Sequence, residues 1–181
     1  MKRVLIVYAT RYGSTGTVSE WIQGRLLLEG ITADIALADE STDMSSYEMI
    51  LFGSGIYGHK FLPAVENLIK ENQTLLKDKI TGIFGVAMRT ETFFKGGRAY
   101  GGAVMLEKYG AMLGSRCLIG KILGGEMIFE KLSDADRSGL EKFYESIRLS
   151  ETDKAQRKTP RTLLNKKQCW DFAEEIISIL S

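Results

Sequence analysis

Hydroxyl and glycine residues gather near the start of the chain, in the stretch YATRYGSTGT at positions 8–17. The first N–H groups of a helix have no acceptor within the helix, and the helix dipole gives them partial positive charge. A glycine-rich turn from a strand into a helix is therefore an anion site, to which Thr10, Ser14 and Thr15 add hydroxyl donors. Gly13 allows the backbone to come close to a ligand. We predict that the turn binds a phosphate monoester; the alternative is that Ser14 or Thr15 only caps the helix.

Apolar patterns on either side of this turn predict the elements that hold it in place. Runs typical of strands cover residues 3–8, 31–38, 47–53, 80–87 and 116–123. Helical spacing occurs at residues 18–28, 63–69, 99–113, 133–147 and 170–180. This alternation predicts an α/β fold, with a doubly wound, five-stranded parallel sheet and right-handed crossovers. We expect residues 1–181 to form a single domain.

Ligands in such sheets bind beyond the carboxyl ends of the strands. Besides the hydroxyl turn, this rule selects residues 54–61 and 88–97. Tyr57 in the first of these loops, and Phe93 and Phe94 in the second, could stack on a flat ligand. The alternative for the two phenylalanines is a place in the core or in a partner-binding patch.

Three other patterns explain the sequence less well. The segment GSGIYG at positions 53–58 fits the dinucleotide pattern G-x-G-x-x-G, but Pro63 delays the following helix. The acidic residue that should follow, Glu71, falls in a helical pattern instead of near a strand end. No G-K-[ST] phosphate loop occurs, and a receiver domain would need an aspartate where this chain has Gly53 and Ser54.

The composition is that of an ordinary globular protein. The 181 residues carry a formal net charge of +1, which gives no reason to expect nucleic acid as a partner. Cys117 and Cys169 have neither redox-motif nor metal-site spacing, and we expect no metal. No apolar run approaches the ~20 residues that cross a bilayer, and we see no signal peptide. We therefore expect a cytoplasmic protein.

The region between the fifth strand and the last helix, residues 124–164, is too long for a simple loop. Ser133 is placed as the N-cap of a helix within it. Its end, residues 154–168, holds six basic residues and no acidic one. We interpret the region as an insertion in the same domain. Its basic end could meet acidic head groups at a membrane surface or substrate carboxylates, or could simply be solvated.

The segment TRYGST resembles the phosphate loop of the flavodoxin family, and the order of elements is similar along the whole chain apart from the insertion. The resemblance implies a sheet of order 2-1-3-4-5, non-covalently bound FMN, and phosphate contacts from Thr10, Gly13, Ser14 and Thr15. The family pattern has Thr where this chain has Tyr12. The cofactor-binding residues that the resemblance implies are Thr10, Arg11, Tyr12, Gly13, Ser14, Thr15, Ser54, Gly55, Ile56, Tyr57, Gly58, Ala87, Met88, Arg89, Thr90, Phe93, Gly96 and Gly97.

A closer resemblance is to the flavodoxin-like, menaquinone-dependent protoporphyrinogen IX dehydrogenases. Arg11, YGH at 57–59, RCLIG on the fifth strand and WDFAEEI in the last helix are similar to that group. Members of that group carry a basic and aromatic insertion near the fifth strand. The insertion here is longer, partly acidic, and basic only near its end.

Three hypotheses of function follow. The first is an FMN-containing electron carrier between redox proteins, which needs no catalytic acid or base. The second is a dehydrogenase of protoporphyrinogen or a similar substrate that passes electrons to a quinone. The third is an interaction module that has lost the cofactor. His59, the only histidine, could donate a proton near a flavin or be merely solvated, and the oligomeric state stays open.

Overall fold

A five-stranded parallel sheet forms the centre of the computed structural model, which describes residues 2–39 and 41–181. The strands stand in the order β2-β1-β3-β5-β8, which confirms the predicted order 2-1-3-4-5. Their bounds are β1 Arg3–Ala9, β2 Thr32–Leu37, β3 Met49–Tyr57, β5 Ile80–Ala87 and β8 Cys117–Gly124. The short β4 (Lys60–Phe61) pairs antiparallel with the end of β3.

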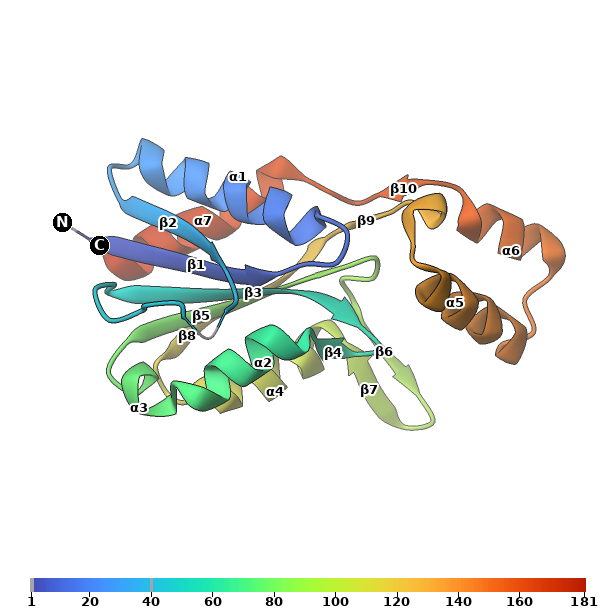
Figure 1. Cartoon of the computed structure of the whole chain (residues 1–181), viewed down its shortest axis with the longest axis horizontal. Coiled ribbons are helices and arrows are strands. Elements are labelled where there is room, and N and C mark those ends of the chain that lie inside the picture. Colours follow the sequence, from blue (N-terminus) through green and yellow to red (C-terminus); the bar gives the residue numbers. More distant parts are fainter. Residues whose placement is uncertain (1, 40) are drawn as a thin grey trace.

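Helices cover both faces of the sheet (Figure 1). One face carries α1 (Ser14–Leu28) and α7 (Lys166–Leu180). The other carries α2 (Pro63–Glu71), α3 (Gln73–Leu76) and α4 (Gly102–Leu113). Because side chains alternate along a strand, Val4 and Ile6 of β1 pack toward α1 and α7, whereas Leu5 and Val7 pack toward α2 and α4. The near-continuous apolar strands of the sequence are thus explained by burial on both faces.

The glycine pattern of residues 53–58 serves packing and a turn. Gly53 lies in β3 against the buried ring of Phe84, and a Cβ at Gly53 would lie only 2.1 Å from Cζ of that ring. Gly58 has φ 54° in the turn from β3 to β4. The helix that follows begins only at Pro63, so these glycines do not form a strand-to-helix dinucleotide turn.

The loop after β5 contains a hairpin that sequence patterns did not reveal. Strands β6 (Thr92–Lys95) and β7 (Arg98–Gly101) pair antiparallel around Gly96 and Gly97, whose φ angles are 56° and 75°. Positive φ at both central residues is what a tight two-residue hairpin turn requires. The helix predicted from residue 99 instead begins at Gly102, because residue 99 pairs within the hairpin.

The insertion projects beyond the carboxyl ends of the strands (Figure 1). It contains β9 (Glu126–Met127), a 3-10 turn η1 (Phe129–Lys131), α5 (Asp134–Ser146), α6 (Glu151–Lys158) and β10 (Arg161–Thr162). Strands β9 and β10 pair antiparallel at its base. The predicted N-cap is confirmed, because Ser133 Oγ accepts a hydrogen bond from the Asp136 N–H.

The basic run at the end of the insertion is helical in part, which the sequence analysis did not predict. Helix α6 begins at a second serine cap, Ser150, whose Oγ accepts from the Asp153 N–H. Within residues 2–39 and 41–181, no helix is both long enough and apolar enough to cross a membrane.

Candidate functional site

A cavity of about 90 Å³ lies where β1, β3 and β5 end and α1 begins. It brings together parts of all three loops that the sequence analysis selected. Its lining residues are Thr10, Tyr12, Ser14, Thr15, Gly55, Ile56, Tyr57, Val86, Ala87, Met88, Gly125, Glu126, Met127 and Leu132. The lining combines hydroxyl groups with apolar side chains, as an amphiphilic ligand would require.

The turn into α1 has the features of an anion site. Its N-cap is Gly13, with φ 95°, and no side chain among the described residues caps the helix. The hydroxyls are therefore not spent on capping, which was the alternative explanation for Ser14 and Thr15. Thr10 Oγ1 instead accepts the Gly13 N–H at 3.0 Å and closes the turn. The first N–H groups of α1 are thus left available to an anion.

These residues fit the phosphate end of a flavin nucleotide. Ser14 Oγ accepts a hydrogen bond from the Glu126 N–H at 3.1 Å, which leaves its own proton to donate. Thr15 is only 1% exposed and lines the cavity. Pockets that enclose a whole ligand measure about 300–1,000 Å³, so this cavity can enclose only part of a nucleotide.

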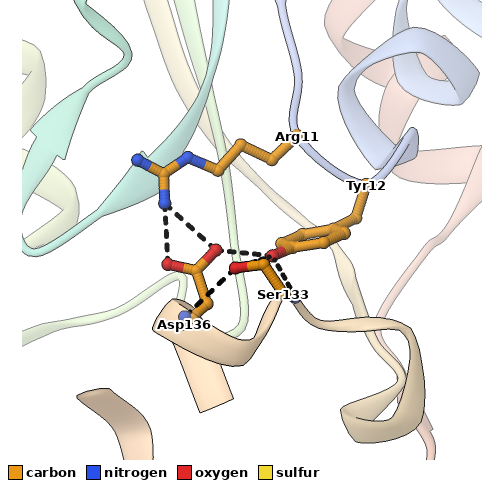
Figure 2. Close-up of polar contacts among 4 residues, drawn as sticks. All are labelled: Arg11, Tyr12, Ser133 and Asp136. Atoms are coloured by element: carbon orange, nitrogen blue, oxygen red, sulfur yellow. Dashed lines mark hydrogen bonds and ion pairs between the residues drawn. The ribbon is translucent and has the colours of Figure 1, made fainter. Parts of the chain in front are cut away.

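Arg11 and Tyr12, which the sequence analysis placed at the cofactor, bind the insertion through their polar groups. Nη1 of Arg11 donates to both carboxylate oxygens of Asp136, at 2.9 and 3.1 Å, and the Tyr12 hydroxyl donates to one of them. The Ser133 N–H donates in turn to the Tyr12 hydroxyl at 3.0 Å. Figure 2 shows these four side chains converging between the turn and the start of α5. The Tyr12 hydroxyl, followed by Arg11, holds the pKa of Asp136 below its usual range.

Tyr57 joins the second loop to this arrangement. The Arg11 guanidinium lies over its ring, with Cζ 4.6 Å from the centroid, and the ring of Tyr12 is 6.4 Å away. Burial raises the pKa of Tyr57 to about 12, with the Arg11 charge acting in the opposite direction. The phenol is therefore neutral at physiological pH and presents an aromatic face beside the cavity.

Several other predicted residues lie outside the cavity lining. Ser54 is buried and connects backbone segments, since its hydroxyl donates to Gly55 O and accepts from the Leu62 N–H. Gly58 forms the turn after β3, and Gly96 and Gly97 form the tip of the hairpin. Arg89 and Thr90 are also outside the lining, although they follow Met88, which is part of it.

Phe93 belongs to an aromatic cluster with Tyr100 and His59. Its ring stacks on Tyr100 with centroids 5.6 Å apart, and the His59 ring lies 6.2 Å from it. The Arg89 guanidinium also lies over the Phe93 ring, with Cζ 4.2 Å from its centroid. Phe94, in contrast, is 77% exposed. The two phenylalanines thus have different roles: one packs within the hairpin, the other faces solvent.

The sequence analysis missed the wall that the insertion contributes. Gly125, Glu126, Met127 and Leu132 line the cavity, as does Val86 of β5. The rule that parallel sheets bind ligands beyond their carboxyl ends applies equally to the fifth strand, β8. Applying that rule to the segment after residue 124 would have included these residues.

Comparison with known proteins identifies the family. A flavodoxin domain family matches residues 5–154. Flavodoxin 1 of Bacillus cereus is similar over 99% of this chain and 100% of its own, at 14% identity and a TM-score of 0.58. A flavodoxin from the domain Archaea is similar over 96% of this chain and 98% of its own, at 15% identity and a TM-score of 0.53. In rubredoxin oxygen:oxidoreductase of Desulfovibrio gigas, 37% of that protein's chain is similar to the whole of this one, at 15% identity and a TM-score of 0.56.

These structural likenesses, all below 25% identity, show the fold, and a search of curated proteins finds no significant match. The family match is the stronger finding, since it spans most of the chain and includes the turn, the sheet and the start of the insertion. The chain belongs to the flavodoxin domain family, and FMN is its cofactor.

Proposed function

We propose that this protein is an electron carrier that binds FMN by its phosphate at the turn into α1. The observation that carries the proposal is the uncapped start of α1, which meets a hydroxyl-lined cavity at the ends of β1, β3 and β5. When bound, FMN supplies one- and two-electron chemistry, and the protein supplies binding and access. The family membership supports this assignment.

The roles of the protein groups follow from their chemistry. The Ser14 and Thr15 hydroxyls and the first N–H groups of α1 would hold the phosphate dianion. Ile56, Tyr57 and Met88 offer apolar and aromatic surface for the flat part of the cofactor. Such a carrier needs no general acid or base, and we assign no catalytic residue.

The hairpin β6–β7 is the surface that we propose for the redox partner. Phe94 is exposed on it. The guanidinium groups of Arg98 in β7 and of Arg89 in the loop before β6 form no ion pair with any residue that the structure describes. Glu91 is the acidic residue of this segment. Because charge complementarity steers association, we expect a protein partner with an acidic surface around its redox centre.

The alternative function is oxidation of protoporphyrinogen with transfer of electrons to a quinone. It would use the basic end of the insertion to attract substrate carboxylates or a membrane surface. Lys154, Lys158 and Lys167 of that segment, however, are already paired with Glu151, Glu141 and Asp171 at 2.7, 2.7 and 2.8 Å. Half of the six basic side chains of this segment are thus neutralised within the protein, which favours the carrier. We expect the carrier to act in the cytoplasm.

The test combines a spectrum with two assays. Protein reconstituted with FMN should show an oxidised-flavin absorption band and bind one equivalent of cofactor. It should accept electrons from a reductase and pass them to an acceptor protein, without turning over protoporphyrinogen in the presence of menaquinone. Failure to bind FMN would refute the carrier and the dehydrogenase together. Turnover of protoporphyrinogen would mean that the protein is the dehydrogenase and not the carrier.

A further inference from the structure

One wall of the cavity comes from the insertion. Glu126, Met127 and Leu132 line the cavity together with residues of β3 and β5. The segment is attached at its base, where the Leu163 N–H donates to Gly125 O at 2.8 Å and β9 pairs with β10. Any ligand that occupies the cavity must therefore contact, or displace, this wall.

The far end of the wall is held by polar contacts, which we call the docking cluster: Arg11, Tyr12, Ser133 and Asp136. The Asp136 carboxylate accepts from both Arg11 and Tyr12, so one side chain of α5 connects to two neighbouring residues of the phosphate-binding turn. Charge-assisted hydrogen bonds of this kind are stronger than neutral ones. Figure 2 shows that Asp136 stands at the first turn of α5 and faces the turn before α1.

Apolar burial contributes little to holding this part of the insertion. Among residues 134–146, all of which the structure describes, Tyr144 is the buried side chain of α5, and no residue of α6 is buried. Phe143 is 51% exposed. Because helices in proteins are normally held by packing of an apolar face, the docking cluster must supply an unusual share of the attachment here.

The docking cluster also decides what Arg11 does. Its guanidinium lies between the Tyr57 ring and the Asp136 carboxylate, so its charge is neutralised by the insertion. The phosphate-binding turn is thereby left with neutral donors, namely amides and hydroxyls. Arg11 thus links the turn, the second loop and the insertion.

We propose that Asp136 is a positioning residue, which docks the insertion onto the phosphate-binding turn so that residues 126–132 close over bound FMN and slow its release. This inference rests on the proposed function, because it takes the cavity to be the FMN site. It predicts that the insertion affects the flavin through a wall, and not through a direct charge on the phosphate.

The first test compares Asp136→Asn with Asp134→Asn. Both substitutions remove one negative charge from the first turn of α5, but the Asp134 side chain is fully exposed, and its ion-pair partner Arg137 lies on the same helix at 3.6 Å. We expect Asp136→Asn to release FMN and riboflavin about five- to tenfold faster in stopped-flow fluorescence, since tenfold corresponds to the loss of one strong polar contact. The Asp134→Asn control should stay within about twofold of the unsubstituted protein.

Two outcomes of this comparison would overturn the proposal. Equal release rates in all three proteins would mean that Asp136 does not hold the wall. Tighter binding of FMN alone, with riboflavin unchanged, would mean that Asp136 merely competes with the phosphate for Arg11. Combining Arg11→Gln with Asp136→Asn gives a further check. The double variant should release flavin no faster than the faster single variant, whereas additive effects on the release rate would mean that the two residues act independently.

The second test uses the protein without flavin. Amide hydrogen exchange in residues 126–147 should be several-fold faster in Asp136→Asn than in Asp134→Asn, while exchange in the β strands stays the same. Faster exchange with unchanged flavin release would reject Asp136 as a control on the cofactor. Absence of flavin binding by the unsubstituted protein would instead reject the proposed function, so the two failures are distinguishable.

Discussion

Removing the two hydroxyls at the start of α1 should reveal the phosphate site most directly. The variant is Ser14→Ala combined with Thr15→Val, where valine keeps the volume of a residue that is 1% exposed. A hydrogen bond to a charged group contributes about 1.5–3 kcal/mol, and 1.4 kcal/mol is a factor of ten in affinity. Losing both should weaken FMN binding by at least about 100-fold.

Riboflavin, which lacks the phosphate, provides the internal reference. Ser14→Ala also removes the acceptor of the Glu126 N–H, but this disturbance of the wall should affect both ligands alike. The decisive quantity is therefore the ratio of the dissociation constants of riboflavin and FMN, measured by quenching of flavin fluorescence, which we expect to fall about 100-fold. Ser19→Ala is the matched control, because this buried hydroxyl of the same helix donates to Thr15 O and does not line the cavity. An equal loss for both ligands would refute phosphate binding at this turn.

Three other expectations can be measured independently. Gly53→Ala should lower the free energy of unfolding by about 1–3 kcal/mol in chemical denaturation, because its Cβ would meet the Phe84 ring. Gly24→Ala, inside α1 with no atom nearby, should raise the free energy of unfolding by about 0.5–1 kcal/mol. Equal effects of the two substitutions would contradict the packing argument. The positive charges of Arg89, before the hairpin, and Arg98, within it, should make the reduction potential less negative than in acidic flavodoxins. Arg89→Gln should therefore lower the potential in a potentiometric titration, and an increase would contradict this. Burial raises the pKa of Tyr57 above its value of 10 in unfolded chains, so the stability that this shift contributes is complete below pH 10 and is lost as the pH rises toward 12. Tyr57→Phe should remove that loss of stability at high pH. Identical profiles of stability against pH for the two proteins would contradict this expectation.

The sequence determined the parts of this protein that depend on neighbouring residues. The apolar runs predicted each strand of the main sheet, since burial on both faces of a parallel sheet leaves little room for polar side chains. The turn at Gly13 and the cap at Ser133 were predictable for the same reason, because both depend on backbone groups within three or four positions. Local chemistry also identified the three loops whose residues meet at the cavity.

Contacts between distant residues were decided only by the tertiary structure. Asp136 lies 125 positions from Arg11, and no spacing rule connects an acidic residue in an insertion with a basic residue in the first turn. The hairpin escaped prediction because its pairing depends on two glycines at positive φ, which sequence patterns had assigned to a loop. The partners of a charged side chain depend on which distant segments the tertiary fold brings next to it. The sequence therefore indicated which residues could bind a phosphate, and the fold decided that the polar groups of Arg11 and Tyr12 contact the insertion.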